Sequence, residues 1–64
     1  MKITLKAARV NAELTQTDAA KALGISKGTI LSYETYKTSP SVEMAERFAA
    51  LYGLPVSSIK FFSE

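Results

Sequence analysis

The chain has 64 residues, of which 47% are hydrophobic and 22% are charged, and its formal net charge is +2. It contains no cysteine and no histidine, which excludes disulfides, thiolate or imidazole metal sites, and nucleophiles activated by histidine. A chain of this length is expected to form one domain, residues 1–64, around a thin hydrophobic core.

The charge is unevenly distributed along the chain. Residues 1–40 carry six basic and three acidic side chains, whereas residues 41–64 carry two basic and three acidic ones. This pattern favours one side that faces an anion, although a solvated surface would give the same counts. No apolar run approaches the roughly 18 residues of a membrane span, and the N-terminus lacks the apolar stretch of a secretion signal. We therefore expect a soluble, cytoplasmic protein with no membrane partner.

The first helix is predicted over about residues 4–13. Leu5, Ala8 and Ala12 recur at helical spacing and form one apolar stripe, with Arg9 beside it.

The next segment reads as two short helices separated by the three residues GIS. Thr15 and Asp18 have the spacing of a capping box, which predicts that the second helix begins after Thr15. Gly24 ends this helix because glycine readily adopts positive φ, and Ser26 is a good N-cap for a third helix over about residues 27–35. Two short helices joined by a glycine-containing turn are the pattern of a helix-turn-helix unit.

The last third of the chain predicts two more helices. Ser41 caps a fourth helix that runs to about Tyr52, and Gly53 follows its end. A short fifth helix is predicted near Val56. The final IKFF segment could be extended, but nothing alternates with period two for long enough to predict a strand. The sequence thus predicts an all-α fold, a compact domain of five helices.

The stretch LKAARVNAELTQTDAAKALGISKGTILSYE, followed by PSVEMAERFAALYGLPVSSI, resembles the Cro/CI-type (XRE-type) helix-turn-helix domain of phage repressors and small bacterial regulators. The resemblance covers about residues 4–60 and rests mainly on Arg9, LTQ, AAKALGIS, and Glu34 followed by Pro40. It implies a lambda-repressor-like fold that binds double-stranded DNA, with the helix at residues 27–35 in the major groove.

The resemblance and the outward face of that helix predict four base-reading residues: Lys27, Gly28, Leu31 and Ser32. Lys27 could donate to guanine or could equally bind a phosphate. Gly28 could allow the backbone to approach DNA closely or could simply be tolerated in the first turn. Leu31 could pack on a thymine methyl or be an isolated surface leucine. Ser32 can bond to several bases and would specify weakly.

Contacts to phosphate are implied for four other residues. Gln16 begins the second helix, where the family contacts a phosphate, although an ordinary exposed glutamine is the alternative. Thr29 is placed for a second such contact. The family usually has NGK after the third helix, whereas this chain has TYK at residues 35–37. Lys37 is retained there, and Tyr36 could offer its hydroxyl to phosphate in place of the backbone.

The resemblance also implies an ion pair between Arg9 and Glu34, which would join the first helix to the end of the third. This pair is structural and is not predicted to bind DNA.

The aromatic residues at the end of the chain predict a homodimer. Ile59, Phe61 and Phe62 are expected to form its interface, since one small domain offers little core to accept them; the alternative is that the rings fold back on the monomer. Two-fold symmetry would place two recognition helices about 34–36 Å apart, to match a palindromic operator.

The predicted function is therefore a sequence-specific DNA-binding transcriptional regulator, most simply a repressor. The alternative is a protein-interaction module or an antitoxin-like protein that binds a partner. An enzyme is not expected, because the only aspartate, Asp18, is assigned to a helix cap and the glutamates are scattered. No cofactor, metal or small-molecule ligand is predicted.

Overall fold

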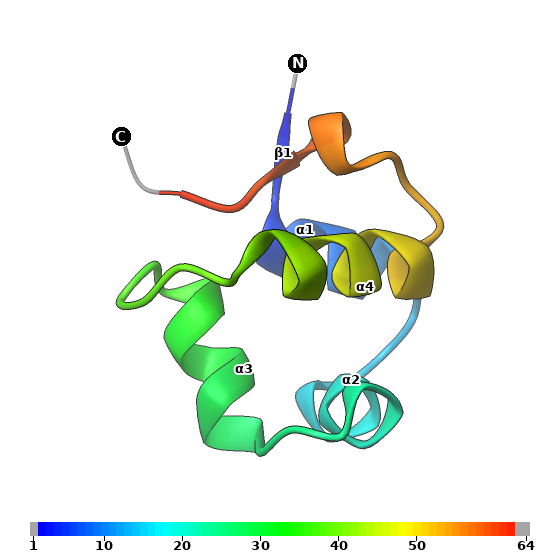
Figure 1. Cartoon of the computed structure of the whole chain (residues 1–64). Coiled ribbons are helices and arrows are strands. Elements are labelled where there is room, and N and C mark those ends of the chain that lie inside the picture. Colours follow the sequence, from blue (N-terminus) through cyan, green and yellow to red (C-terminus); the bar gives the residue numbers. More distant parts are fainter. Residues whose placement is uncertain (1, 63–64) are drawn as a thin grey trace.

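The computed structural model describes residues 2–62. Its elements are, in chain order, β1 (Ile3–Thr4), α1 (Leu5–Asn11), α2 (Gln16–Leu23), α3 (Lys27–Glu34), α4 (Val42–Tyr52), the 3₁₀ helix η1 (Val56–Ser58) and β2 (Ile59–Lys60). Figure 1 shows α1 and α4 in the middle of the molecule, with α2 and the start of α3 on one side and β1, η1 and β2 on the opposite side. None of the described helices is long and apolar enough to cross a membrane.

The described residues contain four α-helices, so the prediction of five is wrong, although the helical class is correct. The segment near Val56 forms a single 3₁₀ turn of three residues. The chain then becomes extended at Ile59, with φ −114° and ψ 133°. Runs of 3₁₀ helix are usually this short, because their hydrogen-bond geometry is poorer than that of an α-helix.

A parallel sheet of two strands, each two residues long, joins the two ends of the described chain, and we call it the terminal sheet. Ile3 of β1 pairs with Ile59 of β2, and Thr4 pairs with Lys60. The prediction of an all-α fold missed this sheet, because two residues are too few to show alternation and the partner strands lie far apart in sequence.

Each of the four α-helices begins at a hydroxyl cap. In every case the cap side chain accepts a hydrogen bond from the backbone N–H three residues further on; the caps are Thr4, Thr15, Ser26 and Ser41. The capping box predicted at Thr15 is present in full. Hydrogen bonds from the backbone N–H and the hydroxyl of Thr15 hold the pKa of Asp18 below its ordinary value.

The same four helices also end alike. Each is followed by a residue with left-handed backbone, namely Glu13 (φ 61°), Gly24 (φ 70°), Tyr36 (φ 61°) and Gly53 (φ 72°). The next residue in each case donates its N–H to the carbonyl five residues back, over 2.9 to 3.2 Å. These are Schellman motifs. The sequence predicted the two glycines but not Glu13 and Tyr36, since residues other than glycine are uncommon at positive φ.

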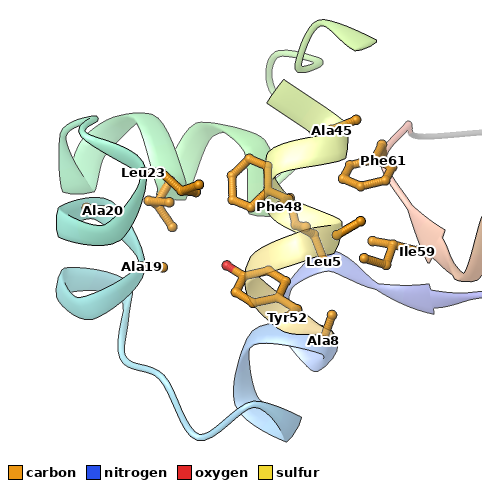
Figure 2. Close-up of a cluster of buried hydrophobic side chains, with 12 residues drawn as sticks. Leu5, Ala8, Ala19, Ala20, Leu23, Ala45, Phe48, Tyr52, Ile59 and Phe61 are labelled. Atoms are coloured by element: carbon orange, nitrogen blue, oxygen red, sulfur yellow. The ribbon is translucent and has the colours of Figure 1, made fainter. Parts of the chain in front are cut away.

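The hydrophobic core is centred on Phe48 of α4, which is fully buried. Its ring packs against Tyr33 (ring centroids 5.7 Å apart, edge to face), Tyr52 (5.8 Å) and Phe61 (6.4 Å). Figure 2 shows Phe48 between Leu23 of α2 and Phe61 near the end of the chain. The core therefore connects the α2–α3 side of the molecule with the terminal sheet.

Two of the three residues predicted at a dimer interface belong to this core. Ile59 is 1% exposed and Phe61 is 4% exposed, so both side chains are covered almost completely within the monomer. The β1–β2 pairing places both side chains against the helices. For these two residues this agrees with the alternative stated above, that the end of the chain folds back on the monomer. Phe62 differs, since 60% of it is exposed.

The left-handed residue after α1 allows a stability prediction. Glu13→Gly is expected to raise the free energy of unfolding by about 1 kcal/mol, because a Cβ disfavours this backbone conformation. Urea denaturation followed by circular dichroism measures the change. Gly24→Ala is the matched control: an added Cβ there meets no atom within 4 Å, so its expected loss of about 1 kcal/mol isolates the backbone cost. A Glu13→Gly variant less stable than the unaltered chain would contradict the argument.

Candidate nucleic-acid interface

The bend between α2 and α3 fixes how the two helices meet. Gly24 provides the left-handed turn, and Ile25 packs partly buried against the core. Ala19 and Ala20 of α2 are buried, at 0% and 5% exposure, and belong to the hydrophobic core. The bend leaves one side of α3 turned away from this core.

The outward side of α3 carries the predicted base-reading residues. Lys27, Gly28 and Leu31 are exposed, and Ser32 is half-buried. Ile30, on the inward side, is completely buried. The structure therefore brings the four predicted residues onto one surface, with a lysine at the N-terminal end and an apolar side chain in the middle.

Packing within the protein does not require glycine at position 28. A Cβ built there would lie 3.9 Å from the Ser26 hydroxyl oxygen, an ordinary van der Waals contact, and would meet nothing else within 4 Å. Glycine costs about 1 kcal/mol in a helix relative to alanine. The fold thus gives no reason of its own for this residue.

The predicted phosphate contacts lie at the ends of α2 and α3. Gln16 begins α2, and its side-chain amide donates to Glu34 Oε1 over 3.2 Å. An amide has two N–H groups, so a second remains for another acceptor. The hydroxyl of Thr29 shares a hydrogen bond of 2.9 Å with that of Ser26. Lys37 is exposed in the turn that follows α3.

The structure contradicts the prediction that the Tyr36 hydroxyl contacts phosphate, because this hydroxyl is bonded within the protein. The hydroxyl donates to the backbone carbonyl of Lys60 over 2.8 Å and accepts the N–H of Leu5 over 3.4 Å. Because the single O–H hydrogen is already used, it is not free for a phosphate.

The inward end of α3 is held by the carboxylate of Glu34. The ion pair predicted with Arg9 is present: Nε donates to Oε2 over 2.6 Å, and Nη2 donates to Oε1 over 3.4 Å. Gln16 donates to the same carboxylate, and Arg9 Nη1 also donates to the carbonyl of Leu14 over 2.8 Å. The two charged side chains are 9% and 3% exposed. One buried carboxylate therefore connects α1, α2 and α3.

Tyr52 of α4 lies near this carboxylate. Burial, and then the negative charge of Glu34, raise the pKa of Tyr52 to about 12, while Arg9 opposes the shift. The buried hydroxyl has no hydrogen-bond partner within residues 2–62. A phenol held neutral without a partner contributes packing and no proton chemistry. Nor does the described part of the chain contain a group of acidic side chains that could hold a metal ion.

Sequence reasoning missed a second contact between helices. Arg47 of α4 donates from Nη2 to the carbonyl of Leu23, at the end of α2, over 2.9 Å. Nothing in the local sequence of α2 indicates it, because the donor lies 24 residues away on another helix. This bond satisfies a carbonyl that the end of a helix would otherwise leave open.

Breaking the carboxylate cluster is expected to destabilise the fold strongly. Glu34→Gln leaves the Arg9 charge buried without its counter-charge, and the expected loss is about 3 kcal/mol of unfolding free energy. Urea denaturation is the measurement, with Glu46→Gln on the exposed side of α4 as a control that should change stability by less than about 0.5 kcal/mol. Equal stability of the two variants would show that the ion pair does not hold the helices together.

Two helices joined by a three-residue bend, the second with one side exposed and turned away from the core, define a helix-turn-helix domain. Comparison with known proteins agrees with this class: residues 5–59 match the helix-turn-helix family. The chain belongs to this family, in its Cro/CI (XRE) type, as the resemblance implied.

Several curated proteins are similar to the chain. A cryptic phage CTXphi transcriptional repressor of Vibrio cholerae, RstR, is 38% identical over 88% of this chain, which spans about half (50%) of that protein. An uncharacterised HTH-type transcriptional regulator of Methanocaldococcus jannaschii is 38% identical over the whole chain and 97% of its own length. Another such regulator, from Archaeoglobus fulgidus, is 30% identical over the whole chain and 90% of its own length. No solved structure gives a significant match.

Proposed function

We propose that this protein is a transcriptional regulator that binds double-stranded DNA by placing α3 in the major groove. The observation that carries the proposal is the division of α3 into two sides. Lys27, Gly28 and Leu31 are exposed on the outward side, while Ile30 and Glu34 anchor the inward side in the core and the ion pair. The regulators and the repressor among the similar proteins support the same function.

In the proposed complex, phosphate contacts set the register and α3 reads the bases. The second N–H of the Gln16 side chain, at the start of α2, and the ammonium group of Lys37, in the turn after α3, would contact the DNA backbone. Lys27 would donate to guanine O6 and N7, and Leu31 would pack on a thymine methyl. Gly28 would let the helix backbone come close to the groove floor, which explains a glycine that the fold does not need.

We further propose that the protein represses transcription by excluding polymerase from a palindromic operator that it binds as a homodimer. The name of the similar phage protein supports repression. Phe62 supports dimerisation: it is exposed and lines a hollow together with Lys2, Lys60 and Phe61. A second copy covering this ring would remove apolar surface from water.

The dimer proposal predicts a concentration-dependent mass. Sedimentation equilibrium at tens of micromolar should detect a dimer, and Phe62→Ser should shift the chain to the monomer because it removes the apolar contact. Val42→Ser is the matched control, since Val42 is also an exposed apolar residue, at 77%, but lies at the start of α4. A strict monomer, or equal dissociation by both variants, would count against this interface.

DNA binding predicts a steep dependence on salt. Affinity for duplex DNA should fall strongly between about 50 and about 200 mM salt. A plot of the logarithm of affinity against the logarithm of salt concentration should have a slope of about −0.9 for each phosphate contacted.

Two variants separate phosphate contacts from base reading. Gln16→Ala should weaken binding to all duplexes alike, whereas Lys27→Ala should reduce discrimination between sequences. Selection of duplexes from a random pool, followed by fluorescence anisotropy, measures both effects. An apolar interface with a protein partner, the alternative function, would not show the salt slope.

The Gly28→Ala variant distinguishes a role of Gly28 in DNA binding from a role in folding. The variant should be at least as stable as the unaltered chain, because alanine favours a helix and the methyl group has room. Its duplex affinity should nevertheless fall, since the methyl group would keep the helix from the bases. Unchanged affinity would show that Gly28 is only tolerated.

A further inference from the structure

Tyr36 has a backbone conformation that its residue type disfavours. It follows the last turn of α3, at φ 61°, and its N–H bonds to the carbonyl of Tyr33 over 3.1 Å. Glycine would adopt this conformation without steric cost, whereas a Cβ makes it less favourable, both at Tyr36 and at the exposed Glu13 after α1. At Tyr36 the side chain makes contacts that can offset this cost.

Those contacts connect α3 to the opposite side of the molecule. The phenol oxygen lies 2.8 Å from the carbonyl oxygen of Lys60 in β2, to which it donates, and 3.4 Å from the N–H of Leu5 at the start of α1. The ammonium group of Lys60 also lies 5.7 Å from the ring centroid, within range of a cation–π interaction. One side chain thus fastens the turn after α3 to the terminal sheet and to α1.

The turn that Tyr36 fastens is the one that presents Lys37. The backbone N–H of Lys37 bonds to the carbonyl of Ser32 over 2.9 Å, and Thr38 bonds to the same carbonyl over 3.4 Å. These bonds set the path of the backbone, and the side chain of Lys37 leaves it into solvent. Because Lys37 directly follows Tyr36, movement of the ring would move the point from which the lysine extends.

We propose that Tyr36 is a positioning residue for DNA recognition: its phenol holds the turn after α3 against the terminal sheet, so that Lys37 meets the phosphate backbone. This inference rests on the proposed DNA binding and adds a role in it for β2 and the start of α1. Tyr36 itself does not touch the DNA, because its hydroxyl is engaged inside the protein.

A double-mutant cycle between Tyr36 and Lys37 tests the proposal. Tyr36→Phe keeps the ring and removes both hydroxyl contacts, and it should lower duplex affinity about fivefold and flatten the salt slope by about 0.9, the value for one phosphate. In a Lys37→Ala background the same change should alter affinity less than about twofold, because the positioned group is already gone. A variant that merely lost stability would weaken binding equally in both backgrounds.

Tyr52→Phe is the matched control, because it removes a buried tyrosine hydroxyl that has no hydrogen-bond partner in residues 2–62. Its duplex affinity should stay within about twofold of the unaltered chain. Tyr36→Gly is a second variant, which adopts the positive φ freely but lacks the ring, and it should lose affinity like Tyr36→Phe. All variants are compared at a temperature where circular dichroism shows each of them fully folded.

Two results would overturn the proposal: Tyr36→Phe binding as tightly as the unaltered chain, or an equal loss with and without Lys37. Either would leave the proposed DNA binding intact, since the unaltered chain would still bind duplexes in a salt-dependent way. Absence of salt-dependent duplex binding by the unaltered chain would instead overturn the proposed function, and this inference with it.

Discussion

The buried carboxylate of Glu34 is the contact on which the arrangement of the helices depends. It accepts hydrogen bonds from Arg9 of α1 and Gln16 of α2, and it belongs to the last turn of α3. Taking two charges out of water is costly, and the cost is offset only when geometry and hydrogen bonding are nearly complete. The carbonyl of Leu14 supplies one of the remaining partners by accepting from the guanidinium of Arg9. The cluster therefore restricts the three helices to a narrow range of relative positions.

This constraint explains how so short a helix can present a binding surface. An isolated helix of eight residues is not stable in water, so α3 depends on its neighbours for its existence as well as for its orientation. Its hold on the core is narrow: Ile30 is its only fully buried residue. Glu34 and the Schellman turn at Tyr36 secure its C-terminal end, and the Ser26 cap secures its N-terminal end. The residues on the outward side of α3 are consequently not needed to hold the helix in place.

The terminal sheet has a larger role than its four residues suggest. By pairing β1 with β2 it brings Ile59 and Phe61 into contact with Phe48 and the rest of the core. It also supplies the carbonyl of Lys60 that receives the Tyr36 hydroxyl. The side of the molecule farthest from the α2–α3 bend in Figure 1 is thereby tied to the turn that follows α3. Phe62 remains outside this arrangement, exposed at the end of the described chain.

The sequence by itself determined the features that depend on near neighbours. Helix caps and helix ends depend on residues a few positions apart, and they include the caps at Thr15, Ser26 and Ser41 and the ends at Gly24 and Gly53. The two helices of the helix-turn-helix unit could therefore be predicted. The Arg9–Glu34 pair was accessible only through the family resemblance. The tertiary structure alone decided the β1–β2 pairing, the burial of Phe61, the inward turn of the Tyr36 hydroxyl and the bond from Gln16 to Glu34. Each of these joins groups that are distant in sequence, and the energy of such contacts depends on packing that no local pattern encodes.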